Sequence, residues 1–530
     1  MAPRLGGCFL ALVIVGPLAS GDAAALDAAP AVHRPARPDA AESARPASAE
    51  RSTLGRAEGL VMLDYELIRL PGQGSIDLMG FHVLQRLNDW MFLGVGGYAP
   101  LVKGAYGGFM AFDATLHAQR RLWGDLFANG GLSMGGGGGG KSKQQSVALS
   151  GTGGFVKAYL GLGYDFTGFA VGANVARMKF RQSAIDDTRL NVFVQLPFAY
   201  TVGPFAKSGD RLAAADAGGL FDESSETTLT WGLDNFVQID PTGSSKGTIR
   251  VVDLQFAHYM TSRAYWYASL GVGYRGLPLY NQMVGGLGYR LELSPRIGLH
   301  AQLGVGSGGY APEDVDTGSG LLVYPKLAAE YAIAPNLGLA LSAGYLFAPK
   351  GTSKNYTWGA SLNYRIQSGR RSAPPGPTSD PAVYAGYRFS LFPQADVKVA
   401  YRGIDRARID MLSGQLDTIV GDHVYVPVKG SIAYSAYLGY PGYGELLAGV
   451  GLQSRHTGDD RFQFFGQLLG GANVHGLLVQ AGIGLNYSLS DRLAIYASAG
   501  KTRSTTSGDQ KFKADYAGLG LTYRFSVPTR

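Results

Sequence analysis

The chain has 530 residues, of which only 16% are charged, with 78 glycines and a formal net charge of +7. A soluble protein of this size usually carries about 25% charged residues, whereas the mean hydropathy of +0.01 is too low for a bundle of membrane helices. Strands that show alternate residues to lipid and to water would average to this neutral profile.

The first 56 residues have the pattern of an export signal followed by a tail. Arg4 precedes the short apolar run 8–15, and small residues follow it. This pattern predicts a signal peptide over residues 1–25. Residues 26–56 are rich in Ala, Pro and Arg and have little to bury, so we expect a disordered periplasmic tail.

Cys8 is the only cysteine and lies in the predicted signal. The mature chain would therefore have no disulfide, no Cys-ligated zinc and no cysteine nucleophile. The net charge is positive, but the lysines and arginines are not clustered, so we expect no nucleic-acid partner. Neither a metal nor a cofactor is expected.

Linker-like segments at 201–225 and 367–380 divide residues 57–526 into three similar repeats. The repeats span residues 57–200, 226–366 and 381–526. Each contains a strand-turn-strand phrase and closes on a strand-like run, in the same order. The first two repeats also share an Asp, a His five residues later and a Trp eight residues after that. These are Asp77, His82 and Trp90 in the first repeat, and Asp253, His258 and Trp266 in the second. Asp396 and Tyr401 repeat the first of these spacings in the third repeat.

The strand-turn-strand phrases alternate with a period of two. In the first repeat, Leu160 and Leu162 share one face, while Lys157 and Tyr159 share the other. The inward face is polar or Gly in strand after strand, which a soluble barrel with an apolar centre would not tolerate. Aromatic side chains at the outward strand ends predict an interfacial girdle. We assign to it Tyr164, Tyr331, Tyr487, His82, His258 and Tyr401.

Turn lengths also alternate, with short turns such as 294–296 and 490–492 and longer loops such as 135–152 and 306–319. Short periplasmic turns and longer external loops are typical of transmembrane barrels. We count about eight strands per repeat. The prediction is an all-β fold, a transmembrane antiparallel β-barrel of about 24 strands (22–26), in which 406–430 would supply any additional hairpin.

The last strand, Tyr516–Phe525, alternates and ends in an aromatic residue, with Tyr523 and Phe525 on the outward face. It resembles the C-terminal assembly signal of Gram-negative outer-membrane β-barrel proteins of the porin-like class. Five residues follow Phe525, which is a departure from that pattern. The resemblance implies location in the cell outer membrane, with outer-membrane lipid and the barrel-assembly machinery as partners.

Two features would point to an enzyme or a nucleotide site, and neither is supported. Residues 135–142, GGGGGGKS, fit the P-loop pattern, but the required strand-to-helix context is missing. His82 and His258 have no accompanying nucleophile motif. We therefore expect no catalytic residues, and no enzyme.

Two functional hypotheses remain. The first is a channel for passive diffusion or export, with a possible periplasmic export partner and a wide lumen. Its pore would be lined by Lys157, Asp165, Lys326, Glu330, Arg365 and Arg524. The alternative is a structural or surface-binding protein that does not conduct, made of three tandem eight-stranded barrels. Inward glycines argue against the alternative, because they would leave small barrels poorly packed.

Overall fold

The computed structural model describes residues 54–70, 74–139, 149–212, 226–311, 313–334, 336–367, 383–401, 404–436, 441–455, 461–505 and 512–529. The side chains of 367, 396–407 and 529 are also outside the description. The predicted signal peptide, the tail, most of both linkers and much of the glycine-rich loop lie outside the described residues. In the described part of the chain, no helix has the length and apolar character needed to cross a bilayer.

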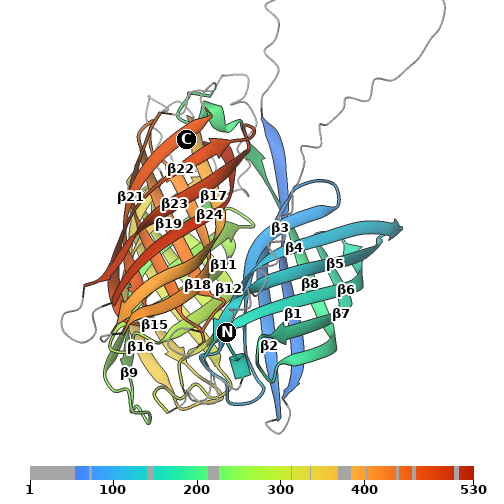
Figure 1. The fold of residues 1–530 in the computed structure, drawn as a ribbon, viewed down its shortest axis with the longest axis vertical. Coiled ribbons are helices and arrows are strands. Elements are labelled where there is room, and N and C mark those ends of the chain that lie inside the picture. Colours follow the sequence, from blue (N-terminus) through green and yellow to red (C-terminus); the bar gives the residue numbers. More distant parts are fainter. Residues whose placement is uncertain are drawn as a thin grey trace, which may run out of the picture. The chain divides into compact units, whose positions relative to one another are not determined.

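The described strands form three separate closed barrels of eight antiparallel strands each (Figure 1). The first barrel consists of β1 (Gly55–Leu70), β2 (Gly74–Arg86), β3 (Met91–Ala99), β4 (Met110–Trp123), β5 (Leu126–Gly138), β6 (Gly154–Phe166), β7 (Phe169–Phe180) and β8 (Asp186–Val202). It closes because β8 pairs with β1, for example Leu196 with Val61. A short 3-10 helix, η1 (Phe205–Lys207), follows.

The second barrel closes through pairing of β16 with β9. Its strands are β9 (Thr227–Gln238), β10 (Thr248–Tyr259), β11 (Ala264–Arg275), β12 (Asn281–Ser294), β13 (Ile297–Gly309), β14 (Leu321–Ala334), β15 (Leu337–Phe347) and β16 (Lys354–Gln367).

The third barrel closes through pairing of β24 with β17. Its strands are β17 (Val383–Tyr401), β18 (Ile404–Ile419), β19 (Val424–Ala433), β20 (Gly444–Gln453), β21 (Phe462–Asn473), β22 (Gly476–Ser488), β23 (Leu493–Ser504) and β24 (Phe512–Thr529). Residues 406–430 belong to β18, β19 and the turn between them, so they add no extra hairpin.

The predicted strand number and the internal repeats are confirmed, but the prediction of one large barrel is wrong. The three strand-turn-strand phrases are the sixth and seventh strands of the three barrels, and the three closing runs are the eighth strands. Because each eighth strand pairs with the first strand of its own repeat, the sheet closes three times. The described strands therefore enclose no 24-stranded lumen.

Inward glycines do not leave these small barrels empty, because aromatic rings from neighbouring strands lie over them. A Cβ added at Gly451 would lie 2.0 Å from Cζ of Tyr425, and one at Gly163 would lie 2.3 Å from Cζ of Phe127. Tyr265 covers Gly288 in the second barrel in the same way. Glycine thus makes room for a large ring inside a narrow barrel.

This packing predicts a difference between two glycines of the third barrel. Gly451→Ala should destabilise that barrel by about 1–3 kcal/mol, because the methyl group overlaps the Tyr425 ring. Gly430→Ala is the matched control, since no atom lies within 4 Å of its added Cβ. Urea unfolding in detergent micelles measures both. Equal unfolding midpoints for the two variants would contradict the ring-over-glycine packing.

The two ends of the first and second barrels differ in connection length as predicted. The chain enters and leaves each barrel at one end, where the connections of these two barrels are short, such as 124–125, 167–168 and 295–296. The opposite end carries longer connections, such as 100–109, 310–320 and 434–443. We call these the short-turn end and the long-loop end. The third barrel departs from this pattern, because its entry end carries the longer connection 454–461 and its opposite end includes the short connections 402–403 and 474–475.

The predicted faces are also confirmed. Leu160 on β6 and Ile483 on β22 are each 71% exposed, whereas Lys157 on β6 is 1% exposed. Across the three barrels, large apolar side chains project outward and many polar side chains are buried inside. The first barrel shows both sets, with Val156, Leu162, Val175, Leu190 and Val192 outside and Asp64, Asp113, Thr115, Asn174 and Gln195 inside.

Candidate functional site in the barrel interiors

The first barrel holds a buried ionic cluster between two apolar layers. Nζ of Lys157 contacts the carboxylates of Asp64 and Glu66 and donates to the Tyr98 hydroxyl at 2.9 Å. All four side chains are almost fully buried. The apolar layer toward the long-loop end includes Ile68, Leu78, Phe109, Phe155 and Phe180. The layer toward the short-turn end includes Leu60, Leu84, Phe92, Phe127 and Phe193.

His82 belongs to this cluster, and its predicted outward position was wrong. Its Nε2 lies 3.2 Å from Oδ2 of Asp113, and its Nδ1 lies 3.7 Å from Oδ1 of Asp64. The error came from the shared spacing of Asp77 and His82 with Asp253 and His258. His82 points inward on β2, whereas His258 lies on the outward face of β10, with its ring tilted beside Trp266 and the ring centroids 5.9 Å apart. The two histidines therefore do not occupy equivalent positions.

The third barrel is likewise filled. Arg388 donates to Oδ2 of Asp417 from Nε at 3.0 Å and to Oε1 of Gln463 at 2.7 Å. Arg524 donates to the hydroxyl of Ser488 at 2.8 Å. Lys429 donates to Oε1 of Gln480 at 2.9 Å, with its Nζ 4.7 Å from the centroid of the Tyr516 ring. These contacts leave the third interior without a wide opening.

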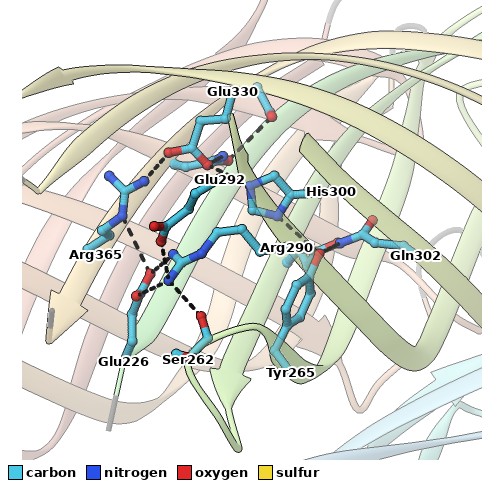
Figure 2. Close-up of polar contacts among 12 residues, drawn as sticks. Glu226, Ser262, Tyr265, Arg290, Glu292, His300, Gln302, Glu330 and Arg365 are labelled. Atoms are coloured by element: carbon cyan, nitrogen blue, oxygen red, sulfur yellow. Dashed lines mark hydrogen bonds and ion pairs between the residues drawn. The ribbon is translucent and has the colours of Figure 1, made fainter. Parts of the chain in front are cut away.

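The second barrel carries the most extended polar network, at its short-turn end (Figure 2). Arg290 on β12 holds Glu226, the residue before β9, in a bidentate pair with distances of 2.6 and 2.9 Å. Its guanidinium also lies over the Tyr259 ring, 4.4 Å from the centroid. Nε of Arg365, on β16, lies 3.5 Å from the same Glu226. One carboxylate thus joins β9 to both β12 and β16.

The network continues from Arg365 toward the middle of the barrel. Arg365 contacts Glu330, which accepts from Asn363 at 2.7 Å and lies 3.3 Å from Nε2 of His300. Figure 2 shows His300 directed between Glu330 and Tyr265. Nδ1 of His300 lies 3.2 Å from the Tyr265 hydroxyl, to which Gln302 also donates at 3.2 Å. Five strands, β11, β12, β13, β14 and β16, together with Glu226 before β9, therefore contribute to one connected set of polar groups.

This interior is less tightly filled than the other two. Several inward polar side chains are only half-buried, whereas most inward polar side chains of the first barrel are fully buried. The half-buried set is Thr230, His300, Gln302, Lys326, Ser342 and Ser361. Toward the long-loop end the barrel is closed by an apolar cluster that includes Phe236, Ile249, Val251, Tyr280 and Leu346. The network is therefore closed toward the long-loop end, and of its members only His300 and Gln302 are half-buried while Glu226, Arg290, Glu330 and Arg365 are buried.

The residues predicted to line a pore do point inward, but they do not meet in one lumen. Lys157, Glu330, Arg365 and Arg524 are buried in three separate interiors, where each has polar partners. Lys326 is half-buried in the second barrel, beside the Tyr324 ring. Asp165 lies at the short-turn end of the first barrel, 3.5 Å from Nη2 of Arg121.

The tyrosines assigned to the aromatic girdle lie on the outward face. Tyr164 and Tyr331 are exposed and Tyr487 is half-buried, each close to the short-turn end of its strand. Tyr523 and Phe525 of the assembly signal also face outward, and β24 continues past them to Thr529. The side chain of Tyr401 lies outside the described residues.

The network around Glu226 and Arg290 was not foreseen from the sequence. Glu226 is the first residue of the predicted second repeat, next to the linker, and Arg290, His300 and Tyr265 match no catalytic or ligand-binding motif. The only signal in the sequence was the period-two alternation along each strand, which predicts that these side chains face the barrel interior. Among the described residues, no group of three or more His, Cys, Asp or Glu side chains is arranged to hold a metal ion.

Comparisons with known proteins give only distant likenesses. No family model matches the chain, and no curated protein matches it. Solved structures similar to it include a de novo designed transmembrane β-barrel, with 14% identity over 26% of this chain and 95% of that one and a TM-score of 0.19. The outer-membrane protein Ail of Yersinia pestis matches with 14% identity, over 27% of this chain and 99% of its own, with a TM-score of 0.19.

A third similar structure is the ferric enterobactin receptor of Pseudomonas aeruginosa, determined as a mutant in complex with enterobactin. Its identity is 10%, over 88% of this chain and 81% of that one, and its TM-score is 0.29. These structures are outer-membrane or designed transmembrane β-barrels. Likenesses of this degree assign neither a family nor an activity, so the functional argument rests on the chain's own residues.

Proposed function

We propose that this chain is an outer-membrane protein with a structural or surface-binding role, whose three filled barrels cross the bilayer without a wide pore. The observation that carries the proposal is the distribution of side chains. Outward positions such as Leu160, Leu327 and Ile483 are apolar and exposed, while the charged residues Lys157, Glu330 and Arg388 are buried inside. A soluble barrel has the reverse arrangement, whereas lipid requires an apolar exterior.

The polar interiors support a structural role within each barrel. Paired charges such as Arg290 with Glu226 link strands that are not neighbours in the sheet. A buried charge is tolerated only when it is paired and hydrogen-bonded, and the Lys157 cluster and the Arg290–Glu226 pair meet that condition while filling the passage. The connections at the long-loop end, opposite the chain termini of each barrel, would then form the external binding surface.

The wide diffusion or export channel is not retained, because it required a single lumen of about 24 strands. Eight-stranded barrels have an interior that side chains fill. The first barrel shows this directly, since apolar layers lie on both sides of the Lys157 cluster.

Two measurements on the purified full chain test the proposal. In planar bilayers we expect no large, long-lived conductance steps, because each interior is filled. On gels, unheated protein reconstituted in lipid vesicles should migrate differently from boiled protein and should remain with the membrane fraction after alkaline washing. Large steady conductance would contradict the filled barrels, and recovery in the soluble fraction would contradict the membrane location.

A further inference from the structure

The short-turn end of the second and third barrels repeats one outward-facing pair of residues. In each pair, an exposed arginine of a turn donates from Nη1 to the hydroxyl of an outward tyrosine at 3.3 Å. The three pairs are Arg263 with Tyr289, Arg296 with Tyr331, and Arg461 with Tyr487.

The strand register produces this pair each time. The arginine immediately precedes a strand residue whose cross-strand partner is the tyrosine. The partners are Ala264 with Tyr289, Ile297 with Tyr331, and Phe462 with Tyr487. Arg492 has the same relation to Tyr523, through Leu493. Four equivalent positions in two barrels therefore hold an arginine beside an outward tyrosine.

The chemistry of the pair suits a phosphate group. A guanidinium has five N–H donors and matches phosphate oxygens with two parallel hydrogen bonds. The contact with tyrosine uses one of these donors, and the tyrosine hydroxyl, which accepts that bond, can donate its own proton. Apolar side chains lie on the same face, Leu287 and Leu291 beside Tyr289 and Ile333 beside Tyr331. Each tyrosine thus lies in the last part of the apolar wall, which Leu291, Leu293 and Ile333 continue to the strand end, and the arginine reaches it from the adjoining turn.

We propose that these four arginine–tyrosine pairs bind the phosphate of anionic phospholipids in the leaflet nearest the short-turn end. The inference rests on the proposed membrane location. The charge at the rim is not uniformly positive, since Glu292 lies near Arg290 and Asp491 precedes Arg492.

The first barrel provides an internal contrast. At the same register, Asp125 precedes Leu126, the partner of Tyr164, and an aspartate would repel phosphate. The arginine–tyrosine pairing at this register is therefore found in the second and third barrels, although Arg120 and Arg121 are exposed at the short-turn end of the first.

The test uses native mass spectrometry of the full chain in detergent, titrated with phosphatidylglycerol. The rim variant combines R263Q, R296Q, R461Q and R492Q. The control variant removes four exposed cations at the long-loop end of the same two barrels, through R275Q, K350Q, K501Q and R503Q. Both variants lose the same net charge. A basic side chain near a membrane surface contributes about 1 kcal/mol, so the rim variant should bind each lipid ~fivefold more weakly.

The control variant should bind phosphatidylglycerol like the unmodified chain. Replacing Tyr289, Tyr331 and Tyr487 by Phe should give a smaller loss, because the guanidinium remains. Unchanged binding by the rim variant, or an equal loss in the control, would overturn the inference. Insertion of all variants into phosphatidylcholine vesicles is scored separately by heat modifiability. Failure of the unmodified chain to insert would instead overturn the proposed membrane location.

Discussion

Lys157→Met is expected to destabilise the first barrel by about 3–5 kcal/mol, because it leaves two buried carboxylates without their cation. Asp64 and Glu66 both contact Lys157, and all three are enclosed between apolar layers. Hydrogen exchange of peptides from β1 and β6, in micelles, measures the loss barrel by barrel. Peptides from the third barrel should be unaffected, since each barrel closes separately.

The control for this prediction removes all three charges together. Lys157→Met combined with Asp64→Asn and Glu66→Gln should recover most of the lost stability, since no uncompensated charge remains inside. If the single variant lost less than about 1 kcal/mol, the cluster would not be the desolvated ion group that the structure shows.

Leu160→Arg is expected to impair insertion, because it places a charge on the outer wall of β6 at mid-strand. Arginine facing lipid at the bilayer midplane costs about 2–4 kcal/mol. The same change at a 71% exposed leucine of a soluble protein would alter stability by only about 0.5 kcal/mol. The measurement is the yield of heat-modifiable protein folded into vesicles.

Trp123→Arg is the matched control for that substitution. Trp123 is 85% exposed at the short-turn end of β4, and a charge near the membrane interface costs only about 0–1 kcal/mol. Equal folding yields for Leu160→Arg and Trp123→Arg would show that depth along the wall does not matter, contrary to a lipid-facing surface.

Much of the fold was predictable because alternation and repetition are local properties of the sequence. The phrases containing Tyr164, Tyr331 and Tyr487 identified equivalent strands and their outward faces. The number of separate barrels was not predictable in this way. One 24-stranded barrel and three eight-stranded barrels have the same alternation of apolar and polar residues along their strands. The difference lies in whether Val61 pairs with Leu196, 135 residues away in the chain, and this is a long-range choice.

Two further errors have physical causes. Inward glycines were interpreted as empty space, whereas the ring of Tyr425 occupies the space beside Gly451. The position of His82 was inferred from spacing to Asp77, but a one-residue shift between strands moves a side chain to the opposite face. The Arg290–Glu226 network could not be located from sequence, because its members are brought together only by closure of the second barrel.

Single-cysteine reactivity at neighbouring positions tests the central claim, that three filled barrels face lipid, most directly. With Cys8 removed, Leu132→Cys and Ser133→Cys on β5 and Leu521→Cys and Thr522→Cys on β24 provide outward and inward pairs. In vesicles, we expect the two outward thiols to react with a lipid-soluble reagent and not with a water-soluble one. The two inward thiols should react with neither reagent until the protein is unfolded. Reaction of the inward thiols with the water-soluble reagent would indicate a water-filled lumen, and reaction of the outward thiols with it would place the wall in water. Either result would contradict the account.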